Sequence, residues 1–127
     1  MAGIIKAVDL KFKYQDNDIL TNTSFEIPQS KITAVVGRNG TGKSTILKLL
    51  AGLLVPQVGK IFIGSQDLNT LSRQDVSKKI AYLGQSNTLA FDLTVAELMQ
   101  LGVNVTSDHG INVSNESVDL AIENHGL

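Results

Sequence analysis

The sequence predicts an α/β fold, and three patterns along the chain lead to this prediction. Residues 4–14 and 19–27 alternate between apolar and polar positions, which indicates two strands that each bury one face. Residues 32–36 are a short run rich in β-branched side chains, as expected for a strand buried on both faces. Residues 46–54 repeat leucine and isoleucine at helical spacing. A hairpin followed by a strand, a loop and a helix predicts an α/β or α+β core with at least one buried strand.

The first two strands should pair as an antiparallel hairpin. Four residues mark one face of the first strand: Val8, Leu10, Phe12 and Tyr14. The alternating positions of the second strand are Thr23, Phe25 and Ile27, and Pro28 ends it. The polar cluster at 15–18 between the two strands is typical of a turn.

A helix and two further strands are expected after the glycine-rich turn at 37–42. The apolar stripe of the helix consists of Ile46, Leu47, Leu49, Leu50, Leu53 and Leu54. Gly52 and Pro56 supply the stop signal for this helix. Residues 60–63 and 80–83 are apolar enough to form two more strands.

Two capping boxes predict where later helices begin. One is formed by residues 72–75 (Ser-Arg-Gln-Asp) and the other by residues 94–97 (Thr-Val-Ala-Glu). The second helix should end at Gly102. We expect residues 103–113 to form a loop or linker and residues 115–125 to form a last helix.

The composition limits the class of protein. The 127 residues allow one domain or most of one, and 43% hydrophobic residues can supply a sizeable core. Eleven basic and twelve acidic residues leave a net charge of −1, which argues against a nucleic-acid partner held by bulk positive charge. Cysteine is absent, so we expect no disulfide framework, thiolate nucleophile or cysteine-bound zinc. We expect no secretory signal, because the N-terminus lacks a basic start and a long apolar run and has an acid at Asp9. We expect no membrane span, because no run approaches about 18 apolar residues.

Residues 37–45 (Gly-Arg-Asn-Gly-Thr-Gly-Lys-Ser-Thr) match the pattern G-x-x-x-x-G-K-[ST] of a phosphate-binding loop. Glycines let backbone N–H groups point inward around a phosphate, and the helix that follows offers further unpaired N–H groups. Lys43 would supply a positive charge for the β- and γ-phosphates, and Ser44 a hydroxyl ligand for Mg²⁺. The alternative is a glycine-rich turn without a ligand, but chance gives this pattern in fewer than about one per cent of chains of this length. The predicted nucleotide-binding residues are Gly37, Asn39, Gly40, Thr41, Gly42, Lys43, Ser44 and Thr45.

Nearly the whole sequence up to about residue 102, and not this loop alone, resembles the nucleotide-binding domain of ATP-binding cassette (ABC) transporters. The segments that carry the resemblance are Lys13-Tyr14 with residues 19–27, the loop with Leu-Leu-Ala-Gly-Leu at 49–53, residues 59–64, and residues 80–85 followed by 93–98. Their order and spacing together are highly specific. The resemblance implies a partial P-loop NTPase core preceded by an antiparallel β hairpin or subdomain.

The resemblance also implies roles for two residues outside the loop. Tyr14 matches the aromatic residue that stacks on adenine, and Gln85 matches the Q-loop glutamine that reaches Mg²⁺ or the attacking water. Without the resemblance, Tyr14 is an ordinary strand aromatic and Gln85 a polar residue after a strand. The implied cofactors are ATP and Mg²⁺, and the implied partners are a membrane-embedded permease and a second nucleotide-binding domain. Such partners would place the chain in the cytoplasm, on the inner face of the cell membrane.

A weaker resemblance, over residues 67–85, is to the ATPases of iron–siderophore and cobalamin importers. Those proteins often place a Gly-Arg-x-Pro-type stretch after the next helix. Here Gly102 is followed by Val-Asn-Val-Thr, so the transported substrate stays open.

Several elements that complete the site of this family are missing from the sequence. It contains no Leu-Ser-Gly-Gly-Gln signature and no apolar strand that ends in Asp-Glu. Residues 89–92 end in an acid but come too early for the aspartate that holds Mg²⁺. Neither His109 nor His125 follows an apolar strand, so neither matches the switch histidine. The tail 118–127 resembles the helix that precedes the signature.

We therefore expect a partial domain over residues 1–127. It should consist of an antiparallel β part (1–30), a P-loop core (31–102), and a linker with the start of a helical subdomain (103–127). A full-length parent would couple ATP hydrolysis to transport, whereas this chain alone should bind MgATP weakly and hydrolyse it negligibly, because the water-orienting carboxylate is missing. One alternative is a non-catalytic half-domain that binds or senses ATP. Another is a different P-loop NTPase or kinase, against which the hairpin before the loop and the lack of an Asn-Lys-x-Asp motif argue.

Overall fold

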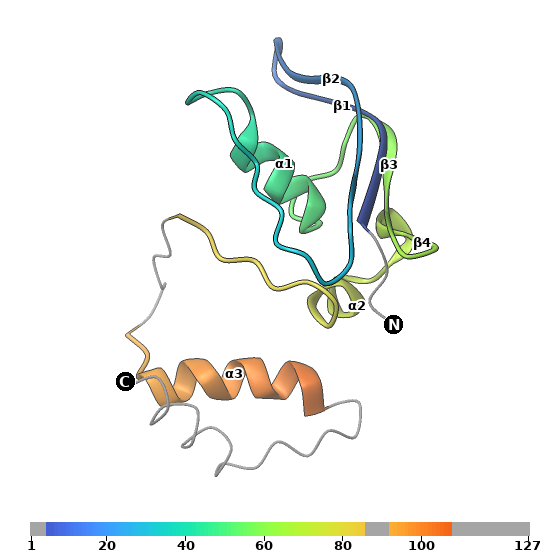
Figure 1. The fold of residues 1–127 in the computed structure, drawn as a ribbon. Helices are drawn as coiled ribbons and strands as arrows, with labels where there is room; N and C mark the ends of the chain where they lie inside the picture. Colours follow the sequence, from blue (N-terminus) through green and yellow to red (C-terminus); the bar gives the residue numbers. More distant parts are fainter. Residues whose placement is uncertain (1–4, 86–91, 108–127) are drawn as a thin grey trace. The chain divides into compact units, whose positions relative to one another are not determined.

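The computed structural model describes residues 5–85 and 92–107 (Figure 1). The chain divides into two units, residues 1–81 and 82–127, and each is described by itself. The first unit contains, in chain order, β1 (Ile5–Tyr14), β2 (Asn17–Ile27), α1 (Lys43–Leu50), β3 (Val58–Ile63), β4 (Gln66–Asp67), the 3-10 helix η1 (Leu68–Thr70) and α2 (Arg73–Ser77). The second unit contains α3 (Val95–Ser107). Strands and helices are thus mixed, as the sequence predicts.

Four strands form one sheet in the order β2-β1-β3-β4. Every neighbouring pair is antiparallel. β1 and β2 are paired from Ile5 opposite Ile27 to Tyr14 opposite Asn17, which confirms the predicted hairpin. β3 pairs with the other side of β1, with Ile63 opposite Ile5. β1 therefore has a partner strand on both sides.

A bulge in β1 changes which of its residues face the core. The strand has one extra residue relative to both neighbours around Asp9, whose φ is 48°. The Asp9 N–H donates to Ser24 Oγ (2.8 Å), and that hydroxyl donates back to the Asp9 carboxylate (3.1 Å). The buried residues of β1 are Ala7, Leu10 and Phe12. The prediction that Val8 shares a face with Leu10 is wrong, because strict alternation fails across a bulge.

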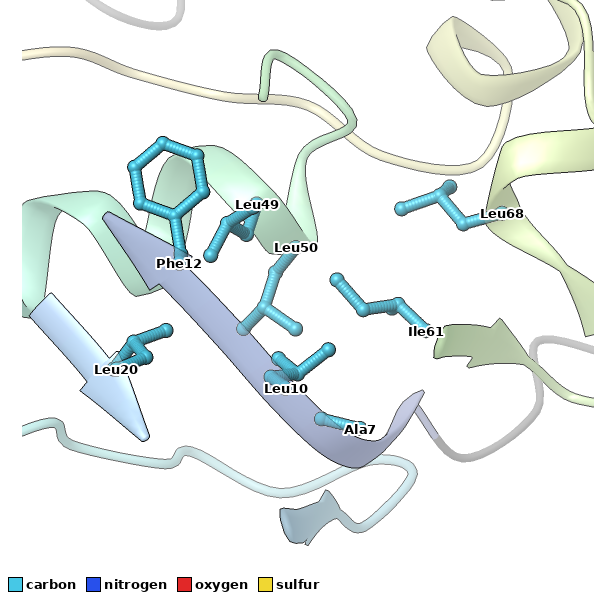
Figure 2. Packing of buried hydrophobic residues seen from close by; sticks show 8 residues of the cluster. All are labelled: Ala7, Leu10, Phe12, Leu20, Leu49, Leu50, Ile61 and Leu68. Carbon is cyan, nitrogen blue, oxygen red and sulfur yellow. The ribbon is translucent and has the colours of Figure 1, made fainter. Parts of the chain in front are cut away.

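The hydrophobic core lies between α1 and the sheet (Figure 2). Its buried members are Ala7, Leu10 and Phe12 from β1, Leu20 from β2, Leu49 and Leu50 from α1, Ile61 from β3 and Leu68 from η1. α1 ends at Leu50, and Gly52 follows with a φ of 70°, as expected for a helix stop. Leu53 and Leu54, which continue the apolar stripe, lie beyond the helix.

Two predicted strands are not formed in the described part of the chain. Residues 32–36 and 80–83 have no strand assignment and no ladder partner there. The Ile32 side chain is fully exposed, Val36 is 87% exposed and Leu83 is 86% exposed. A strand buried on both faces is stabilised by neighbouring strands on either side. The described sheet consists of β2, β1, β3 and β4, and neither segment pairs with any of them. Apolar composition alone therefore does not make these segments strands.

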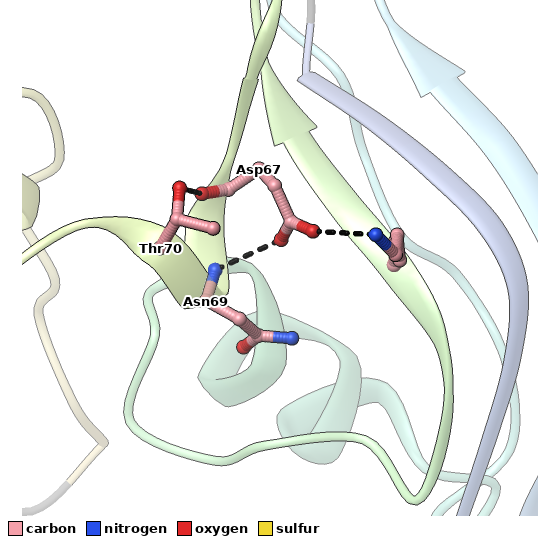
Figure 3. A network of polar contacts seen from close by, with 4 residues as sticks. Asp67, Asn69 and Thr70 are labelled. Carbon is pink, nitrogen blue, oxygen red and sulfur yellow. Dashed lines mark hydrogen bonds and ion pairs between the residues drawn. The ribbon is translucent and has the colours of Figure 1, made fainter.

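Side-chain hydrogen bonds cap η1 and α2, the two short helices that follow β4. Asp67 caps η1, because its carboxylate accepts from the Asn69 N–H (3.0 Å), and it pairs with Lys60 at 3.1 Å (Figure 3). The Asn69 N–H and then the Lys60 ammonium lower the pKa of Asp67. The predicted capping box of α2 is confirmed, since Ser72 Oγ accepts from the Asp75 N–H at 3.1 Å.

The second unit confirms the second capping box and corrects the end of its helix. Thr94 Oγ1 accepts from the Glu97 N–H (3.3 Å), and the Glu97 carboxylate accepts from the Thr94 N–H (2.8 Å), which lowers the pKa of Glu97. α3 continues through Gly102 to Ser107, so the predicted stop at Gly102 and the loop over 103–107 are wrong. One glycine within a helix costs only about 1 kcal/mol, which the surrounding helix can tolerate. The predicted loop over 108–113 and the predicted helix over 115–125 lie outside the described residues. None of the helices in the described ranges is long and apolar enough to cross a membrane.

Candidate functional site

The glycine-rich loop at 37–42 leads directly into α1 and follows a segment without strand assignment. Gly40 and Gly42 have φ values of 79° and 95°, which side chains rarely tolerate. The helix begins at Lys43, and the Ile46 N–H donates to the Gly42 carbonyl at 2.9 Å. The unpaired N–H groups of the first turn therefore begin where the loop ends, as an anion site requires.

Lys43 folds back over the loop that precedes it. Its ammonium donates to the carbonyl oxygens of Gly37 (2.7 Å) and Arg38 (2.6 Å). Thr41 Oγ1 donates to the same Arg38 carbonyl at 2.7 Å. The loop is thus held by contacts among its own residues, with a positive charge against its backbone. Sequence reasoning missed the Arg38 carbonyl, because a backbone acceptor leaves no signature in residue type.

Two glycines of the motif lie where a side chain would collide with a neighbour. A Cβ at Gly37 would lie 2.9 Å from Thr41 Oγ1, and a Cβ at Gly42 would lie 2.6 Å from Ile19 Cγ2. Ile19 belongs to β2, so the hairpin packs directly against the end of the loop. The pattern identifies both glycines, but the contact with Ile19 is long-range and could not be read from it.

The first turn of α1 offers one exposed and one buried hydroxyl residue. Ser44 is exposed, whereas Thr45 is only 7% exposed. Ser44 can therefore meet a ligand, whereas Thr45 is buried and its contact with the nucleotide remains a prediction. Within the described residues, His, Cys, Asp and Glu form no cluster of three or more that could hold a metal ion. The exposed Ser44 hydroxyl fits an Mg²⁺ ion that is bound together with a phosphate group, because such an ion takes most of its ligands from phosphate and water.

Tyr14 ends β1 and is half exposed. Its ring lies edge to face on Phe12, with centroids 4.9 Å apart and planes at 87°. Phe12 is a core residue, 7% exposed, so the ring of Tyr14 rests on a firm support. This setting suits a stacking platform, and the contact with adenine remains a prediction.

Gln85 belongs to the second unit, where it is exposed. Its role toward Mg²⁺ or water remains a prediction. Of residues 89–92, which end in an acid, only Asp92 falls within the described residues, where it is exposed. His109 and His125 lie outside the described residues.

Gln57 is a residue near Tyr14 that sequence reasoning missed. Its side-chain amide accepts from the Lys13 N–H (3.0 Å) and donates to the Lys13 carbonyl (3.1 Å). No motif contains this glutamine, and the contact joins residues 44 positions apart. The alternating pattern of residues 4–14 does not predict this contact between Gln57 and Lys13.

Comparisons with known proteins agree on one family. A family model described as ABC transporter matches residues 20–127. The hemin import ATP-binding protein HmuV of Rhizobium meliloti (strain 1021) is 34% identical over 124 residues, which cover 93% of this chain and 47% of the relative. The vitamin B12 import ATP-binding protein BtuD of Vibrio atlanticus (strain LGP32) is 41% identical over 97 residues, which cover 76% of this chain and 38% of the relative.

One solved structure, described as an ATP binding subunit of an ABC transporter, matches with a TM-score of 0.72 and 27% identity. The match covers 80% of this chain and 42% of the other. The chain thus spans about half the length, or less, of the relatives described here.

Proposed function

The chain belongs to the ABC transporter family, and from this premise we propose that residues 37–45 bind the phosphates of ATP. The observation that supports this most strongly is the placement of Lys43, whose ammonium lies against the Gly37 and Arg38 carbonyls at the start of α1. Lys43 can exchange these neutral acceptors for phosphate oxygens, because hydrogen bonds between charged partners are the stronger ones. The N–H groups of the loop and of the first helical turn would supply the remaining donors.

In this proposal Ser44 is the ligand that the chain contributes to Mg²⁺ within the first unit. The residue is exposed and follows Lys43 directly, at the start of α1. The bound ion would neutralise charge on the phosphates. As the family resemblance implies, Gln85 would reach Mg²⁺ or the attacking water. Tyr14 would stack on adenine, supported by its half-exposed ring at the end of β1.

The proposal for the whole protein is an ATP-binding subunit of an importer. Two relatives are named as import ATP-binding proteins, one for hemin and one for vitamin B12. By analogy, a membrane-embedded permease and a second nucleotide-binding domain would be its partners, and it would lie on the cytoplasmic face of the membrane through the permease. ATP hydrolysis and transport would belong to this complete assembly.

Calorimetric titration with MgATP tests the binding proposal. Lys43→Ala should weaken affinity about tenfold or more, because a charge-assisted contact contributes about 1.5–3 kcal/mol and 1.4 kcal/mol is a factor of ten. Lys48→Ala, in the last turn of the same helix, is the matched control and should bind nearly as the wild type does. Equal affinity of all three proteins would contradict the proposal.

A further inference from the structure

The end of β1 extends beyond the start of its neighbour β3. Val58, the first residue of β3, pairs with Lys11, so the last three residues of β1 have no opposite residue in β3. The residue two positions before Val58 is Pro56, which has no N–H to donate to a neighbouring strand. The backbone of Lys13 would therefore face water on this side of the sheet.

The Gln57 side chain takes the place of the missing strand residue. The backbone N–H of Gln57 donates to the Lys11 carbonyl at 3.0 Å. Its amide then exchanges both hydrogen bonds with Lys13: Oε1 accepts from the N–H (3.0 Å) and Nε2 donates to the carbonyl (3.1 Å). These are the two bonds that a residue in an antiparallel ladder exchanges with its partner. Gln57 thus continues the sheet to the residue immediately before Tyr14.

Tyr14 is consequently supported in two ways. Its ring rests edge to face on Phe12, which is anchored in the core. On the β2 side, Tyr14 pairs with Asn17. On the β3 side, the Gln57 amide holds the backbone of Lys13, the residue immediately before Tyr14. Removal of the Gln57 amide would release one side of this strand end and allow the ring to change its direction.

We propose that Gln57 is a positioning residue for Tyr14, because its amide holds the end of β1 in the sheet and so fixes where the aromatic ring meets the adenine base. The inference rests on the proposed contact between Tyr14 and adenine. Gln57 makes its contacts with Lys11 and Lys13, whereas the phosphate loop is held by its own residues Lys43 and Thr41. The loss of Gln57 should therefore weaken recognition of the base and leave phosphate binding unchanged.

The test compares two ligands, MgATP and magnesium tripolyphosphate, which has the phosphates but no base. Affinities are measured in the intact protein that contains this sequence. Gln57→Ala should weaken MgATP binding about threefold to tenfold, within the range that one base–aromatic contact supplies, and change tripolyphosphate binding less than about twofold. Gln57→Met, which keeps the length of the side chain but not its amide, should behave in the same way. Gln66→Ala, an exposed glutamine in β4 of the same sheet, is the matched control and should affect neither ligand.

Tyr14→Ala separates this inference from the proposal on which it rests. If Tyr14→Ala leaves the ratio of the MgATP affinity to the tripolyphosphate affinity unchanged, the adenine contact is wrong, and the proposed role of Gln57 is wrong as well. If Tyr14→Ala lowers the ratio but the two Gln57 variants do not, the adenine contact stands and the positioning role alone is overturned. An equal loss for both ligands in the Gln57 variants would show general destabilisation and would also overturn the inference.

Discussion

Single residues order the loop at 37–45, the proposed phosphate site, through contacts that the motif does not specify. Thr41 occupies a free position of the pattern, yet its hydroxyl donates to the Arg38 carbonyl that also accepts from Lys43. A hydroxyl at this position thus closes the loop from within. Ordering before the ligand arrives reduces the entropy lost on binding.

Replacing Thr41 by valine should therefore weaken MgATP binding about twofold to tenfold, because the loop loses one internal hydrogen bond worth about 0.5–1.5 kcal/mol. Thr41→Ser keeps the hydroxyl and should stay close to the wild-type affinity. Fluorescence or calorimetric titration of both variants measures the difference. Valine and serine variants of equal affinity would show that the hydroxyl does not order the loop.

Asp67 should make the stability of the first unit depend on pH in the acid range. The Asn69 N–H and the Lys60 ammonium lower its pKa in the folded state. Its contribution to folding is therefore fully present above the unfolded-state pKa and is lost as pH falls through the lowered folded-state value. Asp67→Asn should reduce the loss of stability as the pH falls below about 5, measured by urea denaturation at several pH values.

Asp16→Asn, in the exposed turn between β1 and β2, is the matched control for the loss of one carboxylate. Its acid dependence should remain close to that of the wild type. An acid limb that Asp67→Asn leaves as steep as the wild-type one would rule out this role of Asp67.

At the scale of elements, α1 links the core to the phosphate loop. Leu49 and Leu50 pack in the core cluster with Leu10 and Ile61 of the sheet (Figure 2). At the other end of the helix, the Lys43 ammonium donates to the Gly37 carbonyl of the loop. The helix is only eight residues long, so packing rather than helix propensity must stabilise it. The position of the loop therefore depends on a few leucine contacts.

Leu49→Ala should lower the free energy of unfolding by about 2–5 kcal/mol, as is typical for a fully buried leucine. Leu47→Ala, on the same helix at 46% exposure, should cost less than about 1 kcal/mol. Chemical denaturation followed by circular dichroism gives both values. Similar costs at the two positions would show that α1 does not pack on the sheet as described.

Local signals predicted elements better than they predicted partners. The hairpin, the helix after the loop and both capping boxes were predictable because each depends on neighbouring residues. The bulge at Asp9 was not, because it depends on Ser24 in the adjacent strand. The segment at 32–36 has the composition of a buried strand, but composition cannot supply the strand that would pair with it. The motif predicts which loop residues form the candidate site, whereas the contacts of the Arg38 carbonyl and of Gln57 depend on the folded backbone and could not be predicted from residue types.

At the scale of the whole molecule, exposed apolar residues precede the phosphate loop. Ile32 is fully exposed and Val36 is 87% exposed, in a segment that has no ladder partner among the described residues. An unpaired apolar segment with strand-like composition favours association between copies. The 127-residue chain should therefore form oligomers as its concentration rises.

Ile32→Lys should reduce this association, because a charge opposes pairing at the exposed segment. Val55→Lys, at a 66% exposed valine outside the segment, controls for added charge and should have a smaller effect. Multi-angle light scattering over a range of concentrations reports the mass of each protein. A wild-type chain that stays monomeric throughout would count against the prediction.

Amide hydrogen–deuterium exchange with and without MgATP is the most direct test of the proposed phosphate site, because it locates the protected residues on the chain. MgATP should slow exchange at residues 38–45 and leave residues 64–70, which contain β4 and η1, unchanged. Lys43→Ala should reduce the slowing at the same nucleotide concentration, because its affinity for MgATP is lower. MgATP binding that protects other segments but leaves residues 38–45 unprotected would contradict the assignment of this loop as the phosphate site.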